Sequence, residues 1–194
     1  MIREKAVALL KERITEPVLI KHSLAVGAIM GGMAEYINNQ QVETTTEGRL
    51  SIEEWTNTGI LHDLDFQITK NDPSKHGLMC QSWLEGKLSP ESLHAIKAHN
   101  NEHTGTKPES RMDNALIAAY SLSGLVIATA LVYPSKKLED VKLSSVSKRF
   151  KAKDFARACR RELILYCERV GIEQEKFFEI ALVSLQKIHE DLEL

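Results

Sequence analysis

Three ionisable residues interrupt an apolar segment at residues 59–66. The segment reads GILHDLDF and places His62, Asp63 and Asp65 among leucine, isoleucine and phenylalanine. Ionisable groups are costly in apolar surroundings unless they pair, form hydrogen bonds or bind a metal ion. A further imidazole, His22, lies in the apolar stretch VLIKHSLAV at residues 18–26. Two imidazoles and a carboxylate suit Zn, Mn or Fe, so we expect His22, His62 and Asp63 to bind a metal ion.

The spacing of these residues restricts where such a site can form. Neighbouring residues on a helix point about 100° apart, so His62 and Asp63 reach one ion only near a helix end or beside the backbone. We expect Asp65 either to cap the following turn or to accept a hydrogen bond from a ligating imidazole. Of the seven histidines, six lie between residues 22 and 103, and we expect the seventh, His189, on the solvated surface.

Helical patterns dominate the chain. Thr15 and Pro17 mark the start of a helix whose apolar periodicity continues to about Asn38. Ser51 and Glu54 form a capping-box pattern that opens a helix ending near residues 62–63. Further start and stop signals predict helices from Asp72-Pro73 to Gly86, from Ser89-Pro90 to the HNNEHTG segment, before Pro134, and on both sides of Gly171. The polar stretch at residues 38–49 predicts a loop, and we predict an all-α, single-domain helical bundle over residues 1–194.

The composition limits the partners and the compartment. The 194 residues are 43% hydrophobic and 27% charged, as in a soluble globular domain with a full core. Because 25 basic and 27 acidic residues give a net charge of -2, a nucleic-acid partner is not expected. Three scattered cysteines form no disulfide or thiolate-zinc pattern, and the first residues lack the apolar core of a signal peptide. We therefore expect a cytoplasmic protein.

One apolar stretch approaches the length of a membrane span. The segment ALIAAYSLSGLVIATALVY, residues 115–133, carries no charge and is close to the roughly 20 apolar residues that a spanning helix needs. Its serine, threonine, glycine and tyrosine residues dilute the hydrophobicity, and no other segment resembles it. We expect a buried central helix and no membrane contact.

Together, these features resemble the HD-domain superfamily of metal-dependent phosphohydrolases. The resemblance rests on His22, the His62-Asp63 pair, the later histidines and the long small-residue helix, over roughly residues 17–135. The segment ALIAAYSLSGLVIATALVYPSKKLEDVK is similar to one uncharacterised branch. The resemblance implies an HD-type core, with the C-terminal helices at about residues 144–192 packed on it. In this superfamily the first His, the HD pair and a late Asp bind the metal, and dinuclear members add histidines that match His76 and His99 by position, or alternatively His94 and His103.

One position departs from the superfamily pattern. The late Asp is expected just before SLSGL, where this chain has Tyr120. Asp113 lies seven residues upstream, about 10 Å along a helix, and could replace the missing ligand only with a change of register. Tyrosine is a weak ligand unless deprotonated, and its ordinary pKa is near 10. Either the site works without this ligand, or it has lost its metal or its activity.

Two other patterns have competing interpretations. HNNEH, residues 99–103, matches the H-x-x-E-H motif of inverted zinc peptidases with Glu102 as the base, but its asparagines and the following Gly105 disfavour the continuous helix that the motif needs. The basic cluster KRFKAK, residues 148–153, is interpreted as a solvated face rather than a nucleic-acid contact. Basic residues that flank the expected site are candidates for binding phosphate oxygens: Lys75, Lys97 and Arg111.

The resemblance therefore implies an enzyme that hydrolyses a small phosphate ester, with a nucleotide as the favoured substrate. It would hold one or two divalent ions of Mn, Fe, Zn or Ni, with His62 and Asp63 serving in catalysis as well as in metal binding. A homodimer is compatible with this interpretation. The alternative is a catalytically degenerate HD-fold module that binds a ligand or regulates another protein, and Tyr120 is the residue that favours it.

Overall fold

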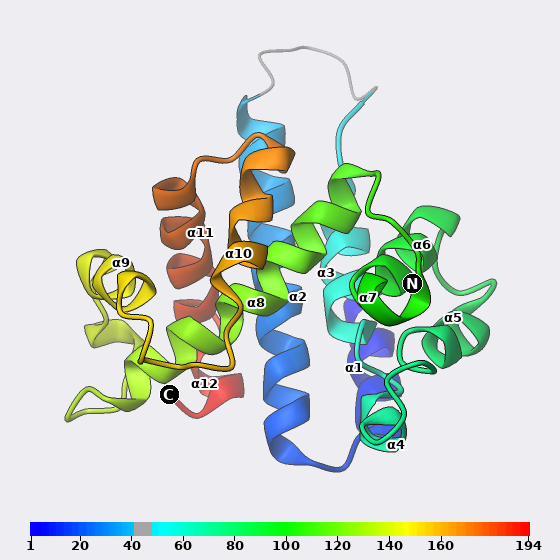
Figure 1. Cartoon of the computed structure of the whole chain (residues 1–194), viewed down its shortest axis with the longest axis horizontal. Helices are drawn as coiled ribbons and strands as arrows, with labels where there is room; N and C mark the ends of the chain where they lie inside the picture. Colours follow the sequence, from blue (N-terminus) through cyan, green and yellow to red (C-terminus); the bar gives the residue numbers. More distant parts are fainter. Residues whose placement is uncertain (41–47) are drawn as a thin grey trace.

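The helix α2 (Pro17–Gln40) runs through the middle of the molecule and packs against α3 (Ile52–Leu61), α8 (Arg111–Leu131) and α11 (Gln174–Gln186) (Figure 1). The computed structural model describes residues 1–40 and 48–194, and all regular secondary structure in these residues is helical. One cluster of buried apolar side chains extends from α1 (Arg3–Arg13) to α12 (His189–Leu192). The prediction of an all-α, single-domain fold is therefore confirmed.

The remaining elements are short and lie around this framework. In chain order they are α4 (Phe66–Thr69), α5 (Leu78–Leu84), α6 (Pro90–Ala98), α7 (Asn101–Thr104), the 3-10 helix η1 (Leu138–Asp140), α9 (Leu143–Lys151), α10 (Arg161–Ile164) and the 3-10 helix η2 (Leu165–Val170). Of the loop predicted at residues 38–49, residues 41–47 lie outside the described residues, and α2 is helical as far as Gln40, in agreement with the predicted helix to about Asn38.

Glycines allow α2 and α3 to approach closely, and this contact sets the distance between two of the predicted ligands. A Cβ on Gly59 would lie 2.7 Å from the Cα of Gly27, and a Cβ on Gly27 would lie 2.5 Å from Cγ1 of Ile60. Carbon atoms do not approach so closely, so a larger residue at either position would force the helices apart. Because His22 lies one to two turns from Gly27 and His62 directly follows α3, the glycine contact holds these two histidines near each other.

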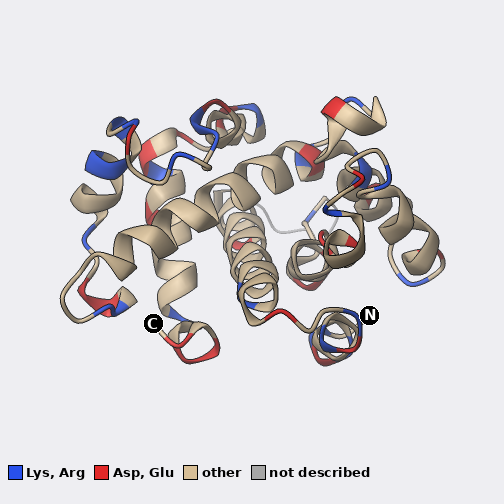
Figure 2. Cartoon of the chain, turned by 60° about the horizontal axis from the view of Figure 1, so that its bottom comes forward, with Lys and Arg blue, Asp and Glu red and all other residues tan. Residues whose placement is uncertain are grey.

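The long apolar helix predicted before Pro134 is α8, which crosses α2 and also packs against α6, α9 and α10 (Figure 1). It begins at Arg111, ahead of the apolar stretch, because Ser110 and Asp113 form a capping box. Both α2 and α8 are long and apolar enough to cross a membrane, a criterion that core helices also meet; 56% of the apolar window of α2 and 72% of that of α8 is buried. Charged residues gather on the peripheral elements, and these two long helices carry few of them (Figure 2).

Two predicted helices differ from the structure. The helix expected from Asp72-Pro73 begins only at Leu78, because Gly77 adopts a φ of +85° and the backbone N–H groups of Gly77 and Cys80 donate to the distant Asp65. On the N-terminal side of Gly171, where one helix is predicted, the chain forms α10 and η2. Here the Arg161 guanidinium donates to several backbone carbonyl oxygens of the preceding segment and holds it in an irregular path.

Candidate metal centre

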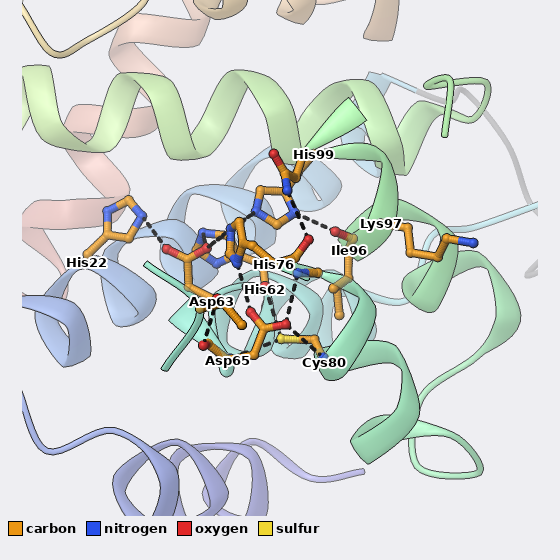
Figure 3. Close-up of polar contacts among 12 residues, drawn as sticks. His22, His62, Asp63, Asp65, His76, Cys80, Ile96, Lys97 and His99 are labelled. Carbon is orange, nitrogen blue, oxygen red and sulfur yellow. Dashed lines mark hydrogen bonds and ion pairs between the residues drawn. The ribbon is translucent and has the colours of Figure 1, made fainter. Parts of the chain in front are cut away.

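Four imidazoles surround the carboxylate of Asp63, just beyond the end of α3 (Figure 3). Oδ1 of Asp63 lies 3.2 Å from Nε2 of His62, 3.3 Å from Nε2 of His76 and 3.4 Å from Nε2 of His99. Oδ2 of Asp63 lies 3.5 Å from Nε2 of His22. The four histidines come from α2, the end of α3, the turn before α5 and the end of α6. The structure thus brings together all five residues that the sequence analysis assigned to metal binding.

Two overlapping groups in this cluster have the spacing of metal ligands. One consists of His22, His62 and Asp63, and the other of Asp63, His76 and His99. Within each group the nitrogen and oxygen atoms all lie within 4.8 Å of one another. Asp63 belongs to both groups and has two carboxylate oxygens, so the cluster is suited to one ion or to two ions that share this residue.

Two of the imidazoles are oriented by backbone carbonyl groups. Nδ1 of His62 lies 2.7 Å from the carbonyl oxygen of Gly59, and Nδ1 of His99 lies 2.5 Å from that of Ile96. A carbonyl oxygen only accepts hydrogen bonds, so each ring donates from Nδ1 and, when neutral, keeps a lone pair on Nε2. These lone pairs face Asp63, which is the arrangement that a metal-ligating histidine requires.

A hydroxyl group holds His22 in the same tautomer, with the proton on Nδ1 and the lone pair on Nε2. Oγ of Ser123, on α8, donates to the carbonyl oxygen of Tyr120 at 2.8 Å and lies 3.3 Å from Nδ1 of His22. Because the hydroxyl proton is engaged elsewhere, Oγ accepts from Nδ1, and the lone pair of His22 is on Nε2 toward Asp63. Desolvation lowers the pKa of His22 to about 4 although Asp63 opposes the shift, so the ring is neutral at pH 7.

Asp65 orients the fourth imidazole from a fully buried position. Its Oδ1 accepts a hydrogen bond from Nδ1 of His76 at 2.8 Å, and its Oδ2 accepts from the backbone N–H groups of Gly77 at 2.9 Å and Cys80 at 3.0 Å. Burial alone would raise the pKa of Asp65, but the hydrogen bond and charge of His76 and the hydrogen bonds from Cys80 together outweigh it, and the pKa is lowered. The carboxylate therefore fixes both a candidate ligand and the start of α5, in agreement with the role predicted for it as partner of an imidazole.

The electrostatics of the cluster favour a cation beside Asp63. Burial alone would raise the pKa of Asp63, but His62, His76 and His99 lower it well below its ordinary value. Despite burial, Asp63 and Asp65 raise the pKa of His76 to about 9, so at neutral pH His76 carries a proton that a metal ion on Nε2 would displace. Nε2 of His76 lies only 2.9 Å from Nε2 of His99, and two nitrogen lone pairs approach so closely only when a proton or a metal ion lies between them.

One atom of the cluster lacks a hydrogen-bond partner. Nε2 of His62 is buried and accepts no hydrogen bond from any residue that the structure describes, although Asp63 lies close to it. A buried polar atom without a partner is costly, and a metal ion would complete its interactions. The orphaned nitrogen, the inward lone pairs and the shared carboxylate fit a metal ion, and we assign the cluster as a candidate metal centre.

Tyr120 lies on α8 next to the cluster, at the position where the superfamily resemblance implies an aspartate. Its ring centroid is 6.3 Å from that of His62 and 5.7 Å from that of His99. Burial raises the pKa of Tyr120, so its hydroxyl is protonated at neutral pH and offers no anionic ligand. Tyr120 therefore adds no charge to the cluster.

A small pocket of about 60 Å³ next to Tyr120 and His99 is lined by a positively charged side chain that the sequence patterns did not point to. Arg160 lines this pocket, with Nη1 2.7 Å from Glu102 and Nε 2.8 Å from Glu162. No local pattern identifies Arg160, because only the folding of a distant C-terminal segment brings it beside α8. Its guanidinium group shares this pocket with His99 of the candidate centre and with Tyr120.

The basic residues proposed from the sequence as phosphate contacts lie away from the cluster. Lys75 is exposed and pairs with Asp72 at 2.8 Å, and Arg111 is exposed at the start of α8. The side chain of Lys97 points away from Asp63 (Figure 3). None of the three belongs to the described lining of the small pocket beside Tyr120.

The alternative histidines also lie elsewhere. Nδ1 of His94 is 3.0 Å from Oδ2 of Asp113, which caps α8 and is therefore committed to a structural role. His103 is exposed on α7, and the chain leaves the helical conformation at Asn100, between α6 and α7. Consequently His99 and His103 do not share one helical face, and the H-x-x-E-H motif lacks the continuous helix that it needs.

No protein-family model matches the chain, and comparisons with curated proteins and with solved structures gave no significant match.

Proposed function

We propose that this protein is a metal-dependent phosphohydrolase of the HD-domain type that acts on a small phosphate ester. The observation that carries the proposal is the convergence of four imidazole Nε2 atoms on the carboxylate of Asp63, at 3.2 to 3.5 Å. Structural histidines seldom point several lone pairs at one carboxylate, whereas hydrolytic metal centres require such a set. The position of the pair at the end of α3 also agrees with the HD resemblance.

Each part of the cluster has a separate role in this proposal. His22, His62 and Asp63 would hold one ion of Mn, Fe, Zn or Ni, and Asp63, His76 and His99 a second. When bound, such ions supply Lewis acidity toward water and phosphoryl oxygens. Asp63 orients the attacking water through a carboxylate oxygen. Arg160 is suited to bind a phosphoryl oxygen pair in bidentate fashion once the ester displaces Glu102 or Glu162.

Metal content is the first test of the proposal. The protein is purified without chelator, and metal per chain is measured by elemental mass spectrometry for the wild type, His62→Ala and His103→Ala. We expect one or two equivalents of a divalent transition metal in the wild type and in His103→Ala, whose exposed imidazole lies outside the cluster. We expect His62→Ala to lose one equivalent, because His62 belongs to only one of the two ligand groups. Hydrolysis of a generic aryl phosphate should follow the metal content, and equal activity in His62→Ala would contradict the proposal.

A second function, a catalytically degenerate module that binds a phosphorylated ligand, is favoured by Tyr120. Its protonated hydroxyl replaces the anionic ligand that the superfamily resemblance implies next to His62 and His99. The variant Tyr120→Asp separates the two functions, with Tyr120→Phe as the matched control. A large gain of hydrolysis in Tyr120→Asp alone supports the degenerate module. An activity in the wild type that Tyr120→Asp leaves unchanged or lowers supports the enzyme.

A further inference from the structure

His22 also lines a second and larger pocket, of about 400 Å³. This pocket lies between the first turn of α2, the last part of α8 and the C-terminal residues 192–194. Its apolar side chains are Val18, Ile127, Leu131, Leu192 and Leu194. It shares no described residue with the small pocket that contains Arg160, so the candidate centre has two pockets of different character next to different histidines.

The polar side chains of the larger pocket are already engaged in other contacts. Nζ of Lys21 pairs with Glu193 at 2.7 Å, and the two nitrogens of His22 face Ser123 and Asp63. A nucleobase placed here would lose its hydrogen bonds to water without gaining matching donors and acceptors, which is unfavourable. The side chains that line this pocket therefore disfavour the binding of a nucleobase.

An apolar group, in contrast, gains from entering this pocket. Val18 is 77% exposed and Leu131 is 49% exposed, although both are aliphatic and both line the same pocket. Removing such surfaces from water is favourable in proportion to the area buried. The volume of about 400 Å³ falls within the range of roughly 300–1,000 Å³ that is typical of small-molecule sites.

We propose that this pocket binds the aliphatic group of the substrate, so that the preferred substrates are alkyl phosphate monoesters rather than nucleotides. The inference rests on the proposed function, because His22 belongs both to the candidate metal centre and to the pocket wall. With the alkyl group in the pocket, the phosphoryl group extends past His22 toward Asp63. In the reaction, the oxygen of water bonds to phosphorus, the bond from phosphorus to the alkyl oxygen breaks, and that oxygen takes a proton. The products are an alcohol and inorganic phosphate.

The kinetic test compares methyl, butyl and octyl phosphate as substrates of the metal-loaded protein. Each buried methylene should raise kcat/KM by roughly fourfold until the pocket is filled. Adenosine monophosphate, which has a larger but polar group, should be a poorer substrate than octyl phosphate. Equal kcat/KM for all three alkyl esters, or a clear preference for the nucleotide, would overturn the inference and leave the phosphohydrolase proposal standing.

A binding test keeps the inference independent of activity. Isothermal titration calorimetry measures methylphosphonate and octylphosphonate, which are not hydrolysed, with the wild type and with Val18→Gln/Leu131→Gln. Glutamine removes apolar wall without adding charge, so octylphosphonate should bind roughly tenfold more weakly to the double variant while methylphosphonate is unaffected. Val183→Gln is the matched control, since Val183 is 44% exposed on α11 and does not line the pocket.

The outcomes of the binding test separate the two proposals. If the octyl compound binds more tightly than the methyl compound and the preference disappears only in the double variant, the pocket is assigned. If the protein shows this octyl preference but holds no metal and hydrolyses no ester, the phosphohydrolase proposal is refuted and the pocket inference stands. Equal affinities for the two phosphonates, or an octyl preference that survives in the double variant, would refute the pocket inference.

Discussion

The two ends of the candidate centre differ in how firmly their histidines are held. At the His99 end, formed by Asp63, His76 and His99, the Asp65 carboxylate and a backbone carbonyl orient the imidazoles, whose side chains are only 12% and 4% exposed. At the His22 end, formed by His22, His62 and Asp63, a backbone carbonyl holds the buried His62, but only a hydroxyl at 3.3 Å orients His22, which is 24% exposed. A site that is oriented before binding loses less entropy when an ion arrives. We infer that the His99 end binds its ion more tightly and that the His22 end, next to the larger pocket, receives the substrate.

Removal of the shared carboxylate should have the largest effect on metal binding. Asp63→Asn keeps the shape of the side chain but removes its negative charge, and both ligand groups depend on this residue. We expect metal affinity to fall at both ends by more than about 100-fold, beyond the loss caused by an outer partner. Competition with a fluorescent chelator measures the metal affinity. Asp72→Asn, at a carboxylate that pairs with Lys75 outside the cluster, is the control. A variant at Asp63 that keeps either ion would show that the ends do not share this ligand.

Single removals at each end should next separate the two ions. We expect His22→Ala and His99→Ala each to lose one equivalent of metal from a protein that holds two, because each removes a ligand from only one group. Elemental mass spectrometry gives the stoichiometry, with His94→Ala as the control outside both groups. If either variant loses all of its metal, the cluster holds a single ion, and the division into two ends is wrong.

Asp65→Asn should weaken the His99 end and leave the His22 end nearly intact. The amide that replaces the carboxylate is not an anionic acceptor for the hydrogen bond that His76 donates. Loss of such an outer partner typically costs 10- to 100-fold in metal affinity. The variant should also unfold at a lower temperature, since Asp65 accepts the N–H groups of Gly77 and Cys80 at the start of α5. Chelator competition and thermal unfolding monitored by circular dichroism provide the two readouts. Equal loss of affinity at both ends would mean that Asp65 supports the fold rather than one ion.

Ser123→Ala should have the smallest effect. The hydroxyl orients only His22, through a contact of 3.3 Å, so we expect a loss of affinity of no more than about tenfold, confined to the His22 end. Ser147→Ala, which removes a hydroxyl bonded to a backbone carbonyl on α9, controls for a general effect of serine loss. An effect as large as that of Asp65→Asn would show that the two ends are held equally firmly.

Much of the candidate site could be predicted from the sequence because several of its residues differ in type from their neighbours in the chain. An HD pair at a helix end and a histidine in an apolar helix conflict with the hydrophobic pattern around them, and that conflict identified His22, His62 and Asp63. His76 and His99 came from the superfamily resemblance, which left His94 and His103 as alternatives. By contrast, the start of α5 was misplaced, because Asp65 caps it from a distant segment.

The sequence by itself determined the helical class, the approximate positions of the long helices and the residues able to bind a metal, since these depend on periodicity and residue type. Only the tertiary structure decided which residues meet. The glycine contact between α2 and α3 sets the approach of His22 to His62, and the segment held by Arg161 brings Arg160 to Tyr120 in place of the predicted lysines. Such contacts join residues far apart in the chain and depend on packing, which no local pattern encodes.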